Sequence, residues 1–170
     1  TERGILLMFD EVQTGLARTG AWFAHQHYGI EPDAISIAKA LGNGMPIGAI
    51  WARNEVAASF KPGDHATTFG GQPMAASAAL ATLEIMKSID APSLANTVGS
   101  AIRGKLEEMN GVVSTRGRGM LIAAELDPAV LNGRTAGEVA NACLHAGLVL
   151  NGVTPTALRI APPLTITFAE

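Results

Sequence analysis

The sequence predicts an α/β protein in which a mainly parallel sheet with helices is followed by a smaller α+β portion. Residues 4–10 form a short strand-like run that is apolar up to its last residue, Asp10, which is typical of strands buried inside a parallel sheet. Glycine-rich turns, further apolar runs and an alanine-rich helical segment follow over residues 11–90. Beyond residue 112 the pattern changes to short strands around one helix. We therefore expect two portions, residues 1–90 and 91–170.

The first portion is expected to place Lys39 directly after its second strand. The elements expected after the strand at 4–10 and a loop at 11–29 are strands at 34–38 and 47–52 and helices at 55–60 and 74–89. Gly42, Gly44, Pro46 and Gly48 make the connection after Lys39 irregular. The last helix carries almost no charge, which predicts burial on most of its sides.

The second portion is expected to alternate helices and short strands. The expected elements are helices at 94–109 and 135–146 and strands at 112–114, 120–126, 148–150 and 158–160. Ser93 is a candidate N-cap for the first helix, and Gly147 is suited to end the second. The polar stretch Arg116-Gly117-Arg118-Gly119 is expected to be a surface turn.

Composition excludes several functional classes. The 170 residues have a net charge of −3 and no basic cluster, so nothing points to nucleic acid. The apolar run Ile5–Phe9 is too short to span a bilayer, and the single cysteine, Cys143, fits a reducing compartment such as the cytoplasm. The four histidines show no metal-ligand spacing. Because no initiator methionine is present, we expect the chain to be a fragment of a longer polypeptide.

Asp10 ends the first of two consecutive strands, and Lys39 directly follows the second. Asp10 is either a loop cap or a ligand-facing carboxylate at the carboxyl end of a strand, where open α/β sheets bind ligands. Lys39 is either a strand-end lysine that extends to water or an amine made nucleophilic by desolvation. Pyridoxal phosphate (PLP) chemistry needs both groups: the lysine holds the cofactor aldehyde, and the carboxylate keeps the pyridine nitrogen protonated.

Two further places are candidates for binding anions. The loop from His65 to Gly71 offers the hydroxyls of Thr67 and Thr68 ahead of a helix, although an ordinary N-cap explains it equally well. Arg159 lies within an apolar run, where it either grips a substrate carboxylate or forms an internal salt bridge. The glycine-rich segment 41–46 has neither the P-loop ending nor the dinucleotide-binding spacing.

Several ordered motifs closely resemble the class-III (subgroup II) PLP-dependent aminotransferases. The motifs are Asp10-Glu11-Val12-Gln13-Thr14-Gly15 with Arg18-Thr19-Gly20, then Ile37-Ala38-Lys39-Ala40-Leu41-Gly42 through Pro46-Ile47-Gly48-Ala49, then Thr67-Thr68-Phe69-Gly70-Gly71. This resemblance implies a fold-type I transferase. Residues 1–90 would then be the later part of its large PLP-binding domain, and residues 91–170 most of its small C-terminal domain.

The resemblance also implies roles for four residues around the cofactor ring. Lys39 would hold the cofactor and then move the proton at the substrate Cα. Asp10 would pair with the pyridinium nitrogen, Val12 would press on one ring face, and Gln13 would hydrogen-bond the phenolic oxygen of the ring.

Beyond the ring, the resemblance implies a homodimer with shared active sites. Thr68, with Thr67 beside it, would reach the cofactor phosphate of the neighbouring subunit. Arg159 would grip the α-carboxylate of the amino-acid or 2-oxo-acid substrate.

Within the class, three segments look most like the acetylornithine aminotransferases of arginine biosynthesis: 25–33, 116–119 and 150–164. A related ω-aminotransferase acting on ornithine, succinylornithine, 4-aminobutyrate or lysine stays open, as does an inactive fragment that kept the fold. Ala17 and Gln72 depart from the glycine and asparagine usual in the family. The N-terminal half of the family's site is absent from this sequence, so we expect the 170 residues alone to be inactive.

Overall fold

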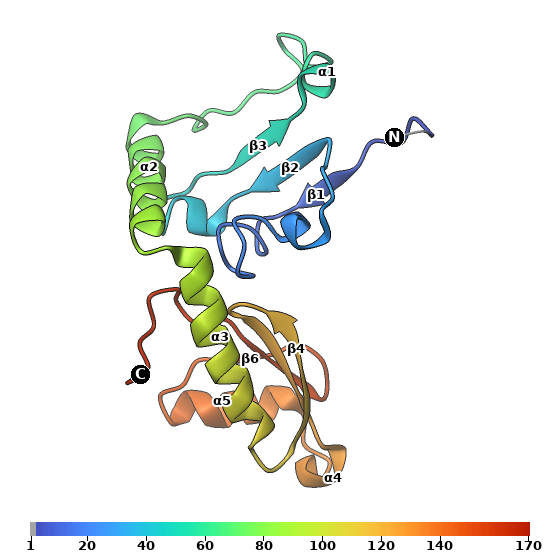
Figure 1. Cartoon of the computed structure of the whole chain (residues 1–170), viewed down its shortest axis with the longest axis vertical. Helices are drawn as coiled ribbons and strands as arrows, with labels where there is room; N and C mark the ends of the chain where they lie inside the picture. Colours follow the sequence, from blue (N-terminus) through green and yellow to red (C-terminus); the bar gives the residue numbers. More distant parts are fainter. Residues whose placement is uncertain (1–2) are drawn as a thin grey trace. The chain divides into compact units, whose positions relative to one another are not determined.

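The computed structural model describes residues 3–170 and divides the chain into two compact units (Figure 1). The first unit comprises the chain up to Ala17 together with Ala21–Ala91, and the second comprises Arg18–Gly20 together with Pro92–Glu170. Within residues 3–170, no helix has the length and apolar character needed to cross a membrane.

The first unit is built on a three-stranded sheet with the order β1-β2-β3 (Figure 1). Its strands are β1 (Met8–Asp10), β2 (Ala34–Ile37) and β3 (Ala49–Ala52). β1 and β2 are parallel, with Asp10 opposite Ser36, whereas β3 runs antiparallel to β2. The physical reason is the length of the connection, because residues 38–48 are fewer than the crossover that a parallel return requires.

The helices of the first unit are short except for the last. They are the 3-10 helices η1 (Ala24–Tyr28) and η2 (Lys39–Leu41) and the α-helices α1 (Asn54–Ala57) and α2 (Pro73–Ser88). α2 begins with Pro73 in its first turn, where the missing N–H has no intrahelical partner to lose.

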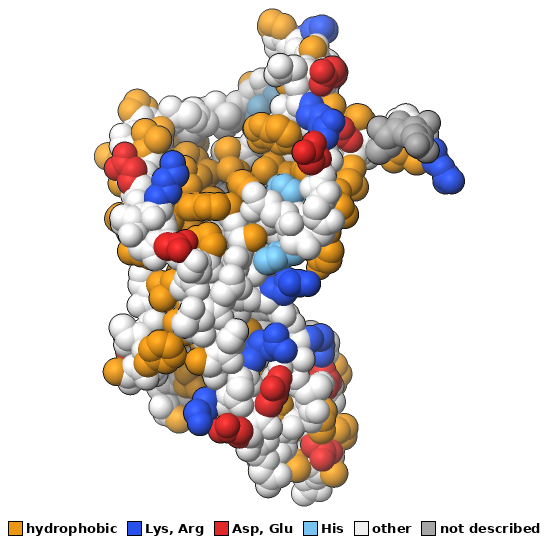
Figure 2. All heavy atoms as spheres, viewed as in Figure 1, with side chains coloured by type: hydrophobic (Ala, Val, Ile, Leu, Met, Phe, Trp, Pro, Cys, Tyr) orange, Lys and Arg blue, Asp and Glu red, His pale blue; other side chains and the backbone are white. Residues whose placement is uncertain are grey.

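Burial in the first unit differs from the sequence prediction at two elements. One face of α2 is buried through Ala75, Ala79 and Met86, but the side chains of Met74, Leu80 and Ile85 are exposed, so the predicted burial on most sides is wrong. Met8 of β1 is also exposed, which contradicts the predicted buried strand. The reason is that, within the described residues, no other element covers the Met8 side chain on its face of β1. Figure 2 shows hydrophobic side chains gathered over α2 and the sheet.

The second unit contains a four-stranded antiparallel sheet with the order β4-β5-β7-β6. The strands are β4 (Val112–Arg118), β5 (Leu121–Leu126), β6 (Asn151–Gly152) and β7 (Ala157–Ile160). The turn expected at 116–119 is therefore largely strand, and the strand expected at 148–150 lies instead at 151–152. Gly117 explains the first difference: its φ is 125°, and a Cβ there would lie 2.0 Å from the Leu121 carbonyl oxygen. Only glycine lets the strand continue at this point.

Three α-helices accompany this sheet: α3 (Ala91–Glu107), α4 (Pro128–Leu131) and α5 (Ala136–His145). α3 begins three residues earlier than predicted, so Ser93 lies inside the helix and is not its N-cap. Asp90, with a φ of 46°, separates α2 from α3, and Pro92 is tolerated because it falls in the first turn. Thr135 caps α5 in a reciprocal capping box with Glu138, and Gly147 follows its C-terminus.

The segment Arg18–Gly20 belongs to the second unit, although it is far from it in sequence. Nη1 of Arg18 donates to the carbonyl oxygens of Pro162 at 2.5 Å and Met120 at 3.3 Å. The Met120 N–H donates back to the Arg18 carbonyl at 2.9 Å, and Asn96 Nδ2 donates to the Gly20 carbonyl at 2.9 Å. Burial lowers the pKa of Arg18 from its ordinary value. The guanidinium thus joins the β4–β5 turn to the segment that follows β7.

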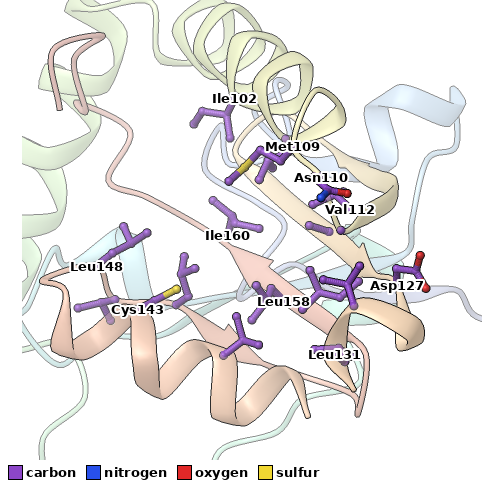
Figure 3. Close-up of a pocket in the computed structure, with 18 of the residues that line it drawn as sticks. Ile102, Met109, Asn110, Val112, Asp127, Leu131, Cys143, Leu148, Leu158 and Ile160 are labelled. Atoms are coloured by element: carbon purple, nitrogen blue, oxygen red, sulfur yellow. The ribbon is translucent and has the colours of Figure 1, made fainter. Parts of the chain in front are cut away.

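The apolar core of the second unit consists of two small clusters. Ala95 and Val98 of α3 pack with Met120, and Ala136 and Ala140 of α5 pack with Leu158. Side chains of α3, the sheet and α5 surround a cavity (Figure 3). Its volume is about 500 Å³. Ile102, Met109 and Ile160 are among the residues that line it. Cys143 also lines the cavity and is half-buried.

Two glycines of α3 allow a direct test of this packing. A Cβ on Gly99 would lie 2.0 Å from the Gly119 carbonyl oxygen, whereas a Cβ on Gly104 would meet nothing within 4 Å. We expect Gly99→Ala to lower the free energy of unfolding by about 3 kcal/mol, because backbone must move. Gly104→Ala should instead raise it by about 1 kcal/mol, through helix propensity. Urea unfolding of both variants checks this, and equal effects would contradict the close approach.

Candidate active site

Asp10 and Ser36 meet at the carboxyl ends of the two parallel strands. Asp10 Oδ1 accepts hydrogen bonds from the Val12 N–H at 2.9 Å and from Ser36 Oγ at 3.2 Å. Both bonds use the same oxygen, so among residues 3–170 the second oxygen, Oδ2, remains open to another donor. The side chain is exposed. Ser36 was not singled out from the sequence, since its role depends on the pairing register of β1 and β2.

Lys39 lies two residues after β2 and is the first residue of η2. Its φ is 47°, in the left-handed region that residues with a side chain rarely adopt, and such strain is concentrated at functional sites. The turn that follows is tight, because a Cβ on Gly42 would lie 2.2 Å from the Met45 carbonyl oxygen. The Lys39 side chain is exposed, so the described residues do not provide the desolvation expected from the sequence.

The turn after Asp10 carries Val12 and Gln13. The Gly15 N–H donates to the Glu11 carbonyl at 2.9 Å and closes this turn, leaving Val12 half-buried and Gln13 exposed. Ala17, where the resembling family usually has glycine, is fully buried with a φ of 65°. It therefore keeps the backbone conformation that glycine favours, at some cost in strain.

Glu11 is a residue of this turn that sequence reasoning missed. Its side chain is buried, and its carboxylate accepts hydrogen bonds from Thr14, from the side chain of His25 and from two backbone N–H groups. Burial raises the pKa of Glu11, but the hydrogen bonds outweigh burial and hold that pKa below its ordinary value. The sequence signal was a second acid directly after Asp10 at the end of a strand, followed three residues later by a hydroxyl.

The two threonines and Arg159 lie apart from this turn in the chain. Thr67 and Thr68 are exposed in the loop that precedes α2, which also contains Gly71 with a φ of 69°. Arg159 belongs to the second unit, where it is half-buried on β7. Its Nη2 donates to Oδ1 of Asn151, the residue paired with it on β6, at 3.1 Å.

Other kinds of site are not evident in residues 3–170. No group of three His, Cys, Asp or Glu side chains there is placed to hold a metal ion. The cavity of Figure 3 is lined by none of the seven sequence-predicted site residues, and its lining is predominantly apolar. We therefore assign that cavity to the packing of the second unit and not to the candidate site.

Comparison with known proteins identifies the same family across the whole chain. The model for "Aminotransferase class-III" matches residues 1–170. Acetylornithine aminotransferase 1 of Bordetella bronchiseptica is 41% identical over 174 aligned residues, which cover 100% of this chain and 43% of that protein. The chain thus spans less than half the length of the curated relatives that it matches.

Solved structures agree with this result. The crystal structure of ornithine aminotransferase from Toxoplasma gondii has a TM-score of 0.89 and 32% identity, covering 99% of this chain and 41% of that one. A second structure of that enzyme has PLP at partial occupancy in its active site. The crystal structure of acetylornithine aminotransferase from Elizabethkingia anophelis has a TM-score of 0.84 and 35% identity, covering 98% of this chain and 42% of that one. The fold-type I prediction is confirmed.

Proposed function

The chain belongs to the class-III aminotransferase family, and from this premise we propose that the full-length protein transfers amino groups with PLP as its cofactor. The observation that carries the proposal is the pair Asp10 and Lys39. Asp10 ends β1 with an open carboxylate oxygen, and Lys39 follows the adjacent parallel strand β2 with a strained backbone. We further propose that residues 1–90 are the later part of a large PLP-binding domain, and that residues 91–170 are most of a small C-terminal domain.

The side chains of the first unit have the chemistry that this cofactor needs. When bound, PLP supplies an electron sink for the negative charge that develops on the substrate Cα. Asp10 Oδ2 can accept the N–H of a protonated pyridine, while Ser36 and the Val12 N–H orient the carboxylate. The Lys39 amine would hold the cofactor covalently and then take the proton that leaves the substrate Cα.

The remaining candidate residues have roles at the edges of the site in this proposal. Val12 would contact one face of the ring, and Gln13 would donate a hydrogen bond to its phenolic oxygen. Thr68, with Thr67 beside it, would bind the cofactor phosphate in the neighbouring subunit of a homodimer. Arg159 would bind the α-carboxylate of the substrate, because its planar guanidinium matches a carboxylate with two parallel hydrogen bonds.

We propose N-acetylornithine and 2-oxoglutarate as substrates, giving N-acetylglutamate semialdehyde and glutamate in arginine biosynthesis in the cytoplasm. The support is that the relative from Bordetella bronchiseptica, which aligns with the whole chain, is named an acetylornithine aminotransferase. Ornithine is the second candidate, because the Toxoplasma gondii structure with a TM-score of 0.89 is an ornithine aminotransferase. Succinylornithine, 4-aminobutyrate and lysine are further alternatives.

The test is a substrate series on the full-length protein loaded with PLP. We expect visible absorbance from the lysine-bound cofactor, and its loss on addition of N-acetylornithine. Ornithine and 4-aminobutyrate are then added separately. A protein that never gains the band contradicts the aminotransferase proposal. A band removed by ornithine or 4-aminobutyrate, and not by N-acetylornithine, contradicts the substrate assignment alone.

Arg159→Ala is expected to raise the Michaelis constants for both the amino donor and the 2-oxo acid. The loss of one charge-assisted, two-pronged contact corresponds to about 2 kcal/mol, or roughly 30-fold. Arg116→Ala is the matched control, because Arg116 lies in the same sheet and forms an exposed ion pair with Glu125 at 2.8 Å. Steady-state kinetics compare the two. If the Michaelis constants of Arg159→Ala are unchanged, the role of this arginine is structural and not in substrate binding.

A further inference from the structure

We propose that Glu11 is a positioning residue for the cofactor site, whose buried carboxylate fixes the turn that carries Val12 and Gln13. This inference rests on the proposed function. Glu11 does not face the cofactor in the proposal; it acts through the turn that it anchors. Four hydrogen bonds meet at the carboxylate of Glu11, a residue that is only 3% exposed.

The two carboxylate oxygens of Glu11 each accept two hydrogen bonds. Oε2 accepts from Thr14 Oγ1 at 2.5 Å and from the Ala24 N–H at 3.1 Å. Oε1 accepts from the His25 N–H at 3.0 Å and from His25 Nδ1 at 3.2 Å. An ionised carboxylate satisfies all four contacts, which agrees with the lowered pKa of Glu11.

These donors come from both ends of the segment that follows β1. Thr14 lies on the near side, just after Gln13, and Ala24 and His25 begin η1 on the far side. The His25 ring is also stacked with the rings of Phe9 and Phe23, at centroid distances of 6.1 and 5.7 Å. The Glu11 carboxylate is therefore bound to the start of η1, where the stacked rings hold His25 in place. Because Thr14 donates to the same carboxylate, Glu11 links Thr14 to η1.

The backbone of Glu11 ties the same turn to the sheet. Its N–H donates to the Ser36 carbonyl at 2.9 Å, and its own carbonyl accepts the Gly15 N–H at 2.9 Å. Asp10, one residue earlier, binds the Ser36 hydroxyl with its side chain. Val12 and Gln13 are thus enclosed between a backbone attachment on β2 and a side-chain attachment at Thr14, which limits where their side chains can point.

Glu11→Gln is a sharp test because of this pairing. A glutamine has one oxygen and one NH₂ group, so either orientation of the amide directs NH₂ at two of the four donors. In the full-length protein we expect Glu11→Gln to weaken PLP binding by the apoprotein by about 10-fold or more. We also expect it to shift the pH midpoint of the visible band and to lower kcat more than it raises KM.

The matched control is Glu138→Gln, which damages the capping box of α5 in the second unit. Both variants should lower Tm, but Glu138→Gln should leave the PLP dissociation constant and the pH midpoint unchanged. If Glu11→Gln lowers Tm but leaves the PLP dissociation constant and the pH midpoint unchanged, Glu11 is merely structural and the inference fails. If the wild-type protein binds no PLP, the proposed function fails instead.

A second variant covers the case in which Glu11→Gln does not fold. Thr14→Val replaces the donating hydroxyl by a methyl group of nearly the same size, and leaves the Glu11 carboxylate with three hydrogen bonds. We expect it to weaken PLP binding by about 3-fold, with the pH midpoint shifted in the same direction as in Glu11→Gln. A dissociation constant and a midpoint equal to those of the wild type would overturn the inference.

Discussion

Replacing Lys39 by alanine is expected to remove the visible absorbance of the full-length protein and to lower kcat by at least about 10⁴-fold. Alanine has no amine, so neither the covalent attachment of the cofactor nor the proton transfer at the substrate Cα can proceed through this position.

Lys87→Ala is the matched control for this experiment, since Lys87 is an exposed lysine near the end of α2 in the same unit. It should leave the absorbance and kcat at wild-type values. Spectra are recorded with saturating PLP, and single turnovers are measured with the amino donor. A visible band that persists in Lys39→Ala would assign the cofactor to another lysine.

Asp10→Asn is expected to lower kcat/KM by about 10²-fold, because a neutral amide no longer favours the protonated ring nitrogen on which the electron sink depends. The backbone should change little, since asparagine can still accept from the Val12 N–H and Ser36 Oγ through its one oxygen. Its NH₂ group then occupies the place of Oδ2 and presents a donor where an acceptor is required.

Ser36→Ala supplies a graded comparison. It removes one of the two hydrogen bonds that orient Asp10, and we expect a loss of about 5-fold in kcat/KM. Asp127→Asn, at the N-cap of α4, controls for the general cost of neutralising a capping aspartate. Steady-state kinetics of the three variants check that the loss of kcat/KM is larger in Asp10→Asn than in Ser36→Ala, and larger in both than in Asp127→Asn. Equal activity of Asp10→Asn and wild type would show that Asp10 does not contact the ring nitrogen.

The family and the fold class were accessible from the sequence because motif order and apolar runs are local properties. The segment from Ile37 to Gly42 identifies the resemblance without any knowledge of pairing, and the family comparison confirms it. The capping residue Thr135 and the first-turn Pro73 of α2 likewise act within one helical turn. Such signals need no tertiary contact to be recognised.

Features that depend on register and neighbours were not accessible. Ser36 faces Asp10 because β1 and β2 pair in one register, and Glu11 reaches His25 across a turn. The exposure of Met8 depends on what covers its face of the sheet, which a run of apolar residues does not reveal. Arg18 belongs to a motif of the family resemblance, but the motif does not reveal its hydrogen-bond acceptors, since these lie 102 and 144 residues further along the chain.

That separation has a consequence during protein synthesis. The guanidinium of Arg18 leaves the ribosome long before its acceptor at Pro162, and at about 5–20 residues per second the interval is on the order of 10 s. Until then the β4–β5 hairpin has no strand β7 beside it, and the segment 18–20 has incomplete contacts. The second unit therefore completes its folding only after translation has passed Pro162. High contact order of this kind makes folding slow, and leaves apolar surface open to chaperones meanwhile.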